Sequence, residues 1–200
     1  MRSVCKTALI AVLCLLLCTA SALADGGVTV SADFGYDGAV TYLSAMPLRV
    51  TLKNDGADTE LTVAIDVDRS SSEYDTYEYP VSLASGAEKQ LVIPIMLNYK
   101  QKTYTVRVTG KEGLIASVPI TPKKVIAPTT LLVGVLSDSP QTLSYLNIGT
   151  ANDQLMRGEV WQTITLTQDT FPDSYELMRA FSFLAVDGVD ISQFSDAQRQ

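Results

Sequence analysis

The sequence contains no histidine, and its three cysteines, Cys5, Cys14 and Cys18, all lie within the first 18 residues. If this N-terminal segment is removed, the rest of the chain has neither a thiol nor an imidazole. These absences exclude thiolate nucleophiles, imidazole bases, disulfides and the usual zinc ligands from residues 25–200. The nucleotide-binding glycine patterns are missing as well. We therefore expect no cofactor and no metal in this part of the chain.

The first 24 residues have the layout of a secretory signal peptide. A basic start is followed by the apolar run 8–18 and by Ala-Leu-Ala at 22–24, which predicts cleavage between Ala24 and Asp25. An uncleaved anchor is the alternative, although the apolar run is short for a span of about 20 residues. A lipoprotein is disfavoured, because leucine and not a small residue precedes each candidate cysteine.

The chain is acidic. It carries 22 acidic and 15 basic side chains, a net charge of −7. Loss of Arg2 and Lys6 with the signal peptide takes the net charge to −9. A nucleic-acid partner needs a basic face, so this balance argues against one. It also argues against simple adhesion to anionic lipid.

Residues 25–122 alternate between apolar and polar residues with a period of two. Short runs of this kind, separated by turn residues, predict a β-sandwich. They resemble bacterial immunoglobulin-like or fibronectin-type-III-like modules, which implies an immunoglobulin-like sandwich here. The resembling stretches are MPLRVTLKNDG, ELTVAIDVD, KQLVIPIML and KTYTVRVTG. Tyr104 is either the corner tyrosine, with its hydroxyl bonded to the backbone, or a half-buried strand tyrosine.

The pattern changes after residue 122. Residues 123–129 are predicted to form an extended, stiff linker, because Pro122 and Pro128 interrupt the alternation. Residues 130–200 then combine continuous apolar strands with short helical patterns, which predicts a parallel sheet covered by helices, an α/β Rossmann-like domain. Only three strands are found and the chain stops within a helix, so we expect this domain to be part of a longer polypeptide.

The stretches VGVLSDSPQTLSYL and VDGVDISQFSDAQRQ resemble the start of a class I glutamine amidotransferase-like domain. Domains of this kind occur in large bacterial envelope proteins, after a signal peptide and a β-sandwich. The resemblance implies an envelope location and, beyond Gln200, a membrane-anchoring helix. It does not imply an activity, because true amidotransferases need a cysteine and a histidine that residues 25–200 lack.

The candidate ligand crevice lies at the carboxyl ends of the parallel strands, where such folds bind ligands. Ser137 and Asp138 follow the first of these strands, and Asp187 and Asp190 follow the third. The alternative is that these residues only cap a helix and form a tight turn.

Two further groups have a binding interpretation and a structural one. Tyr74, Tyr77 and Tyr79 form a candidate interaction surface for a sugar or a protein, or they are strand tyrosines that pack. The acidic residues between 66 and 75 suggest calcium, but the spacing lacks the glycine and terminal glutamate of a calcium loop. A solvated loop is the better interpretation of these acids.

The sequence therefore predicts an exported, non-catalytic cell-envelope protein that acts as a binding or scaffold module at the extracellular face of the membrane. Its expected partner is an envelope protein or a cell-wall polymer. One alternative is a hydrolase-type enzyme that uses serine and carboxylate chemistry in the α/β domain. Another is carbohydrate binding by the β-sandwich.

Overall fold

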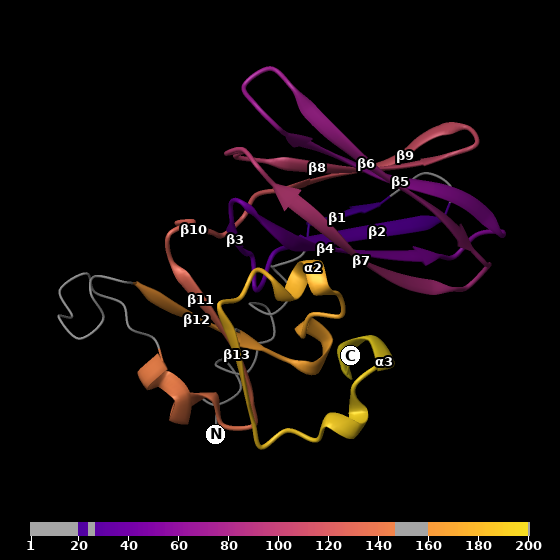
Figure 1. Cartoon of the computed structure of the whole chain (residues 1–200). Coiled ribbons are helices and arrows are strands. Elements are labelled where there is room, and N and C mark those ends of the chain that lie inside the picture. The colour runs from indigo at the N-terminus through magenta and orange to yellow at the C-terminus, as the bar shows by residue number, and fades with distance from the viewer. Residues whose placement is uncertain (1–19, 24–26, 147–159, 200) are drawn as a thin grey trace, which may run out of the picture.

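The computed structural model describes residues 20–23, 27–146 and 160–199, and these are mostly β-strand. Eight strands form two antiparallel four-stranded sheets that pack face to face (Figure 1), and we call them the two-sheet module. These sheets confirm the prediction that this part of the chain is β-rich and antiparallel. One sheet has the order β1 (Ala20–Leu23), β2 (Val28–Phe34), β4 (Ser44–Asn54) and β7 (Glu88–Leu97). The other has the order β6 (Tyr74–Leu83), β5 (Thr59–Asp68), β8 (Tyr104–Gly110) and β9 (Gly113–Ile120).

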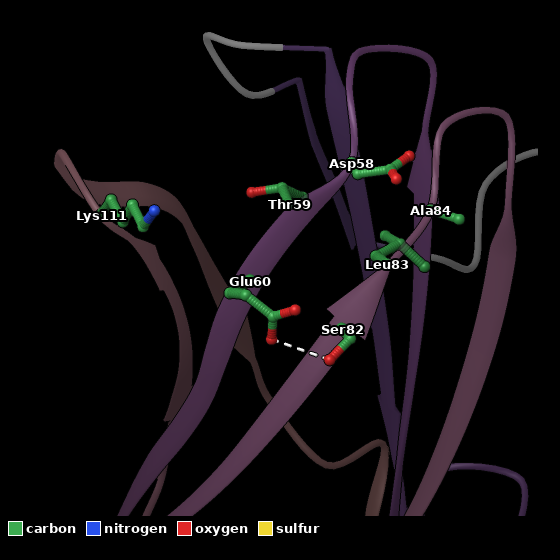
Figure 2. A pocket seen from close by; sticks show the side chains of 7 residues that line it. All are labelled: Asp58, Thr59, Glu60, Ser82, Leu83, Ala84 and Lys111. Atoms are coloured by element: carbon green, nitrogen blue, oxygen red, sulfur yellow. Dashed lines mark hydrogen bonds between the residues drawn. The ribbon is translucent and has the colours of Figure 1, made fainter.

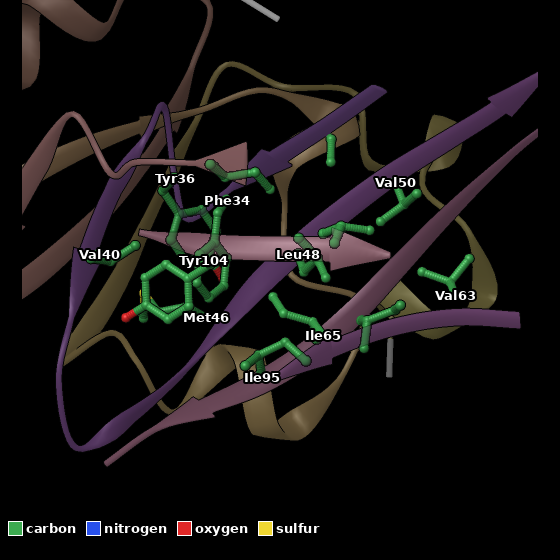
Figure 3. Packing of buried hydrophobic residues seen from close by; sticks show 14 of the residues in the cluster. Phe34, Tyr36, Val40, Met46, Leu48, Val50, Val63, Ile65, Ile95 and Tyr104 are labelled. Atoms are coloured by element: carbon green, nitrogen blue, oxygen red, sulfur yellow. The ribbon is translucent and has the colours of Figure 1, made fainter. Parts of the chain in front are cut away.

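Alternate residues of these strands fill one apolar core. In β2 every second side chain is buried, as its period-two sequence predicts. Figure 3 shows Leu48 and Ile95 of one sheet packed with Ile65 of the other. Phe34 and Tyr104 meet edge to face with ring centroids 4.8 Å apart, the arrangement that aromatic quadrupoles favour.

Tyr104 is fully buried. Among the described residues its hydroxyl makes no hydrogen bond to the backbone, so the corner-tyrosine interpretation is wrong here. Burial, together with the neighbouring Tyr42, raises the pKa of Tyr104 above its usual value. Its contribution is therefore apolar packing.

A buried asparagine fixes one end of the two-sheet module. Asn54 is 1% exposed, and its side-chain amide donates to the carbonyls of Ala57, Leu83 and Ala84. Its Oδ1 accepts the backbone N–H of Gly56 at 2.9 Å. The side chain thereby joins the turn after β4 to the turn after β6, and these bonds offset the cost of burying a polar group.

Residues 131–146 and 160–199 form a smaller unit around three parallel strands, which we call the parallel unit. β11 (Leu131–Ser137) lies between β12 (Trp161–Leu166) and β13 (Phe183–Asp187). Gly134 sits at the centre of β11, where an added Cβ would lie 2.4 Å from Leu184 Cδ2. Glycine at this position lets the side chains of the flanking strands close over the middle strand.

Among the described residues of this unit, the expected helices are short. They are the 3₁₀ segments η1 (Pro140–Leu146), η3 (Gln168–Thr170) and η4 (Ile191–Gln193), and the helices α2 (Tyr175–Met178) and α3 (Asp196–Arg199). The last helix begins with a capping box, in which a serine and a glutamine three residues later exchange hydrogen bonds. The Gln198 N–H donates to Ser195 Oγ, and the Ser195 N–H donates to Gln198 Oε1.

The predicted linker pairs with a short strand in the connection between β2 and β4. Within residues 123–129, β10 (Lys124–Ile126) runs parallel to β3 (Ala39–Thr41) and pairs with it. Lys123 Nζ also lies 3.4 Å from Asp37 Oδ1. The connection is thus held to the loop that precedes β4 and does not run free.

An ion pair on the outer face of the β5 sheet accounts for one of the acidic residues considered for calcium. Arg107 binds Asp66 with both terminal nitrogens, the Nη2–Oδ1 distance being 2.9 Å. Thr76 Oγ1 donates to the same carboxylate. The bonds from Arg107 are the main cause of the lowered pKa of Asp66.

We predict that this pair makes stability depend on pH. Because the folded-state pKa of Asp66 is below its unfolded value of 3.8, its contribution is present above pH ~4 and is lost as the pH falls through the folded-state pKa. Arg107→Met should lower the unfolding free energy at pH 7 by about 0.5–1 kcal/mol, the upper range for a partly exposed pair. The difference from the parent should shrink in urea titrations at acidic pH. Lys53→Met, which breaks the exposed Lys53–Asp55 pair, is the control, and a deficit that persists at acid pH would contradict the assignment.

Candidate functional site

The carboxyl ends of the parallel strands bring the predicted crevice residues together. Ser137 at the end of β11 is the register partner of Asp187 at the end of β13. The Ser137 hydroxyl lies 3.4 Å from Asp187 Oδ2 and accepts the backbone N–H of Ser139 at 3.0 Å. Asp138 follows directly and is exposed.

A polar hollow of about 330 Å³ opens beside this pair. Three of the four predicted residues line it, and Asp187 adjoins it through Ser137. Its other polar lining residues, Thr167, Gln168 and Gln193, were not predicted. Thr167 and Gln168 follow β12, so the rule that parallel strands end at one edge could have found them. Gln168 Nε2 donates to the Gln193 carbonyl, which holds this wall of the hollow in place.

The structure also gives these residues the capping and turn roles considered above. Asp190 Oδ1 accepts the Ser192 N–H at 2.9 Å at the start of η4. Hydrogen bonding with the Ser192 side chain, and then with its backbone N–H, lowers the pKa of Asp190. Gly188 has a φ of 67° and makes the turn after β13. The side chains of Ser137, Gln168 and Asp190 are therefore already held by hydrogen bonds within the chain.

A second set of contacts joins the two-sheet module to the parallel unit. Tyr36 stacks edge to face on Phe181, with ring centroids 4.8 Å apart, and its hydroxyl donates to the Leu177 carbonyl at 3.4 Å. Arg49, on the outer face of β4, donates from Nη1 to the Gly35 carbonyl at 2.9 Å and from Nη2 to the Thr170 carbonyl at 3.4 Å. This arginine is only 8% exposed.

The charge of Arg49 is only partly neutralised. Asp33 Oδ2 lies 3.7 Å from Nη1, while burial raises the pKa of Asp33 against the opposing effect of Arg49. Arg49 Nε is buried without a hydrogen-bond partner among the described residues. The sequence missed Arg49, since an arginine at a polar position of a strand normally lies on the surface.

The structure does not bring the three predicted tyrosines onto one surface. Tyr77 and Tyr79 face inward and pack against the core of the two-sheet module. Tyr74 points to the opposite side and is 64% exposed. The sole tryptophan, Trp161, contacts Phe183 at a centroid distance of 5.4 Å, in keeping with the packing role expected of a tryptophan in a strand.

Another hollow lies at one end of the two-sheet module, near the turn that follows β8. Figure 2 shows Glu60 and Ser82 on adjacent strands, joined by a hydrogen bond of 2.8 Å, with Lys111 across the gap. Asp58 Oδ1 accepts the Ser85 N–H at 2.8 Å. Both carboxylates are therefore engaged within the protein, and the hollow is open and polar.

Within residues 20–23, 27–146 and 160–199, no cluster of three or more metal-ligating side chains is placed to hold an ion. No helix in the same ranges has the length and apolar character needed to cross a membrane.

Residues 27–122 match a family model described as a domain of unknown function, DUF8726. No curated protein matches the chain.

Similar solved structures include the CARDB domain of the PF1109 protein from Pyrococcus furiosus, at 15% identity and a TM-score of 0.34. The match covers 53% of this chain and 95% of that one. The alkylpurine DNA glycosylase AlkC of Pseudomonas fluorescens has 13% identity and a TM-score of 0.36, and the match covers 50% of this chain and 31% of that one. A β-glucosidase from Listeria innocua has 12% identity and a TM-score of 0.34, with 52% of this chain and 17% of that one covered. This chain thus spans less than a third of the length of the glycosylase.

We predict that Arg49 contributes more to stability than a surface arginine does. Arg49→Met keeps most of the apolar stem but leaves the Gly35 and Thr170 carbonyls without their charged donor. The expected loss is about 2–3 kcal/mol of unfolding free energy, measured in urea, because hydrogen bonds to charged groups are the stronger ones. Hydrogen exchange should also quicken in residues 168–181. The control is Arg69→Met, which removes an exposed arginine 3.8 Å from Asp75 and should cost less than about 0.5 kcal/mol. Equal losses in the two variants would refute the role of Arg49.

Proposed function

We propose that this protein is an exported, non-catalytic binding or scaffold module of the cell envelope. In this proposal the two-sheet module is an immunoglobulin-like sandwich and the parallel unit is an amidotransferase-like α/β domain. The two packed antiparallel sheets support the first assignment, and the parallel order β12-β11-β13 supports the second. The leader sequence supports export.

The observation that carries the proposal is the state of the hollow at the carboxyl ends of the parallel strands. Ser137 and Asp190 each accept a hydrogen bond from a neighbouring backbone N–H group, which fixes the orientation of their side chains. Pre-organised polar side chains around a hollow suit ligand binding. Its ligand would be part of an envelope protein or a cell-wall polymer.

Export is the first point to test. Expression of the chain with a C-terminal epitope in a bacterial host should give an exported product whose intact mass begins at Asp25. An Ala24→Pro variant should be processed poorly, and an Ala57→Pro variant, altered outside the leader, should be cleaved normally. A product that stays in the cytoplasm with residues 1–24 attached would refute the proposed location.

The hydrolase alternative has one observation in its favour, the approach of the Ser137 hydroxyl to Asp187. We predict that the protein does not hydrolyse p-nitrophenyl esters above the buffer rate, and that Asp187→Asn leaves this background unchanged. Asp58→Asn, which alters a carboxylate at the other hollow, is the matched control. If the parent hydrolyses the ester, Asp187→Asn abolishes this activity and Asp58→Asn preserves it, then the role is enzymatic and the binding proposal is refuted.

A further inference from the structure

The edge of β2 is covered by a strand that belongs to the leader. β1 pairs antiparallel with β2 in a register that runs from Ala20↔Ala32 to Leu23↔Thr29. β1 also contacts β9 of the opposite sheet. It therefore occupies the margin between the two sheets, beside β2 in Figure 1.

Cleavage between Ala24 and Asp25 would remove β1 and leave β2 as the edge of its sheet. An edge strand presents unpaired N–H and C=O groups along one side. The β2 groups that now bond to β1 would become a template for another strand.

The other edges of the two-sheet module carry features that discourage strand addition. β6 contains Glu78 and Pro80, β7 contains Lys89 and Pro94, and β9 contains Pro119. Prolines and charged residues of this kind protect edges in natural sheets. The stretch of β2 that β1 covers reads Thr-Val-Ser-Ala and contains neither proline nor charge. This edge is suited to pairing.

We propose that, in the exported protein, the β2 edge binds an extended antiparallel segment that belongs to another envelope protein and has uncharged side chains. The proposal rests on the processed, exported form proposed above. The segment Ala-Ser-Ala-Leu, which fills the position in the structure, sets the chemistry of the ligand. Main-chain hydrogen bonds supply the affinity in this mode of binding.

Two observations favour a partner strand over a second copy of the chain. The position beside β2 also lies against β9. A single extended segment therefore fits there better than a strand of a second copy, which would bring the two sheets of that copy with it. The processed chain also has a net charge of −9, which opposes self-association.

The test uses the chain 25–200, which contains no cysteine, and a peptide of residues 19–24 as the probe. Ser21 is the register partner of Ser31. A peptide with Ser21→Cys should therefore form a disulfide with a Ser31→Cys protein in glutathione buffer at least ten times faster than with a Thr29→Cys protein. A peptide that also carries Ala22→Pro should react slowly with both, because proline removes a donor.

Hydrogen exchange gives a second readout. The amides of residues 29–32 should exchange faster in the chain 25–200 than in the 200-residue chain, and the peptide should restore their protection. A chain 25–200 that folds cooperatively only when the peptide is present would also support the proposal. A chain that stays unfolded with the peptide would overturn it, as would equal reaction rates at positions 29 and 31.

Two outcomes distinguish this proposal from pairing with a second copy of the chain and from failure of the proposed function. Disulfide-linked Ser31→Cys dimers that form in preference to the peptide adduct would assign the edge to a second copy and refute the partner strand. The intact mass of the exported product reports on processing independently. An uncleaved product would refute the proposed function, while the peptide experiment would still decide whether β2 accepts a strand.

Discussion

The arrangement of the two parts of this protein depends on a buried cation. Arg49 projects from the outer face of β4, where it donates to the Gly35 carbonyl of its own module and to the Thr170 carbonyl of the parallel unit. Hydrogen bonds from both terminal nitrogens of the buried guanidinium offset part of the large free energy of desolvating the charge. The need for acceptors on both sides therefore ties residues 168–171 to the two-sheet module. Apolar contact alone would let the two parts slide over each other, whereas directional hydrogen bonds fix one position of the parallel unit on the two-sheet module.

The loop between β2 and β4 is shaped to serve this contact. Gly35 has a φ of 82°, and a Cβ there would lie 2.1 Å from the Ala39 carbonyl oxygen. The chain therefore turns sharply, Tyr36 and Ala39 exchange backbone hydrogen bonds, and the Tyr36 ring lies against Phe181. On the far side of the same loop, β3 binds β10. One loop thus holds both the connection and the docked unit, and this orients the polar hollow relative to the sheets.

The sequence predicts features that arise from local periodicity or from a topological rule. The alternation of Val28, Val30 and Ala32 defines the buried face of β2, and the parallel strands had to place Ser137 near Asp187. Side chains of β6 alternate between the two faces of the sheet, so Tyr74 and Tyr77, which are an odd number of positions apart, point to opposite sides. This separation follows from the sequence, although the prediction grouped the tyrosines by residue type alone. The Tyr36–Leu177 and Arg49–Thr170 contacts join residues more than 100 positions apart. No periodicity in one sequence encodes such a pairing, so the docking contact could not be predicted.

Each surface of the two-sheet module has a different physical character. The inner faces form the core, the outer face of β4 lies beneath the parallel unit, and the outer face of β5 carries the Asp66–Arg107 pair. A face covered by charged side chains resists apolar docking, because binding there would desolvate the ions. A strand edge differs, since it offers backbone groups whose hydrogen bonds depend little on side-chain identity. In the processed form proposed above, which lacks β1, a module with its faces already occupied would gain a partner at the β2 edge without repacking its core.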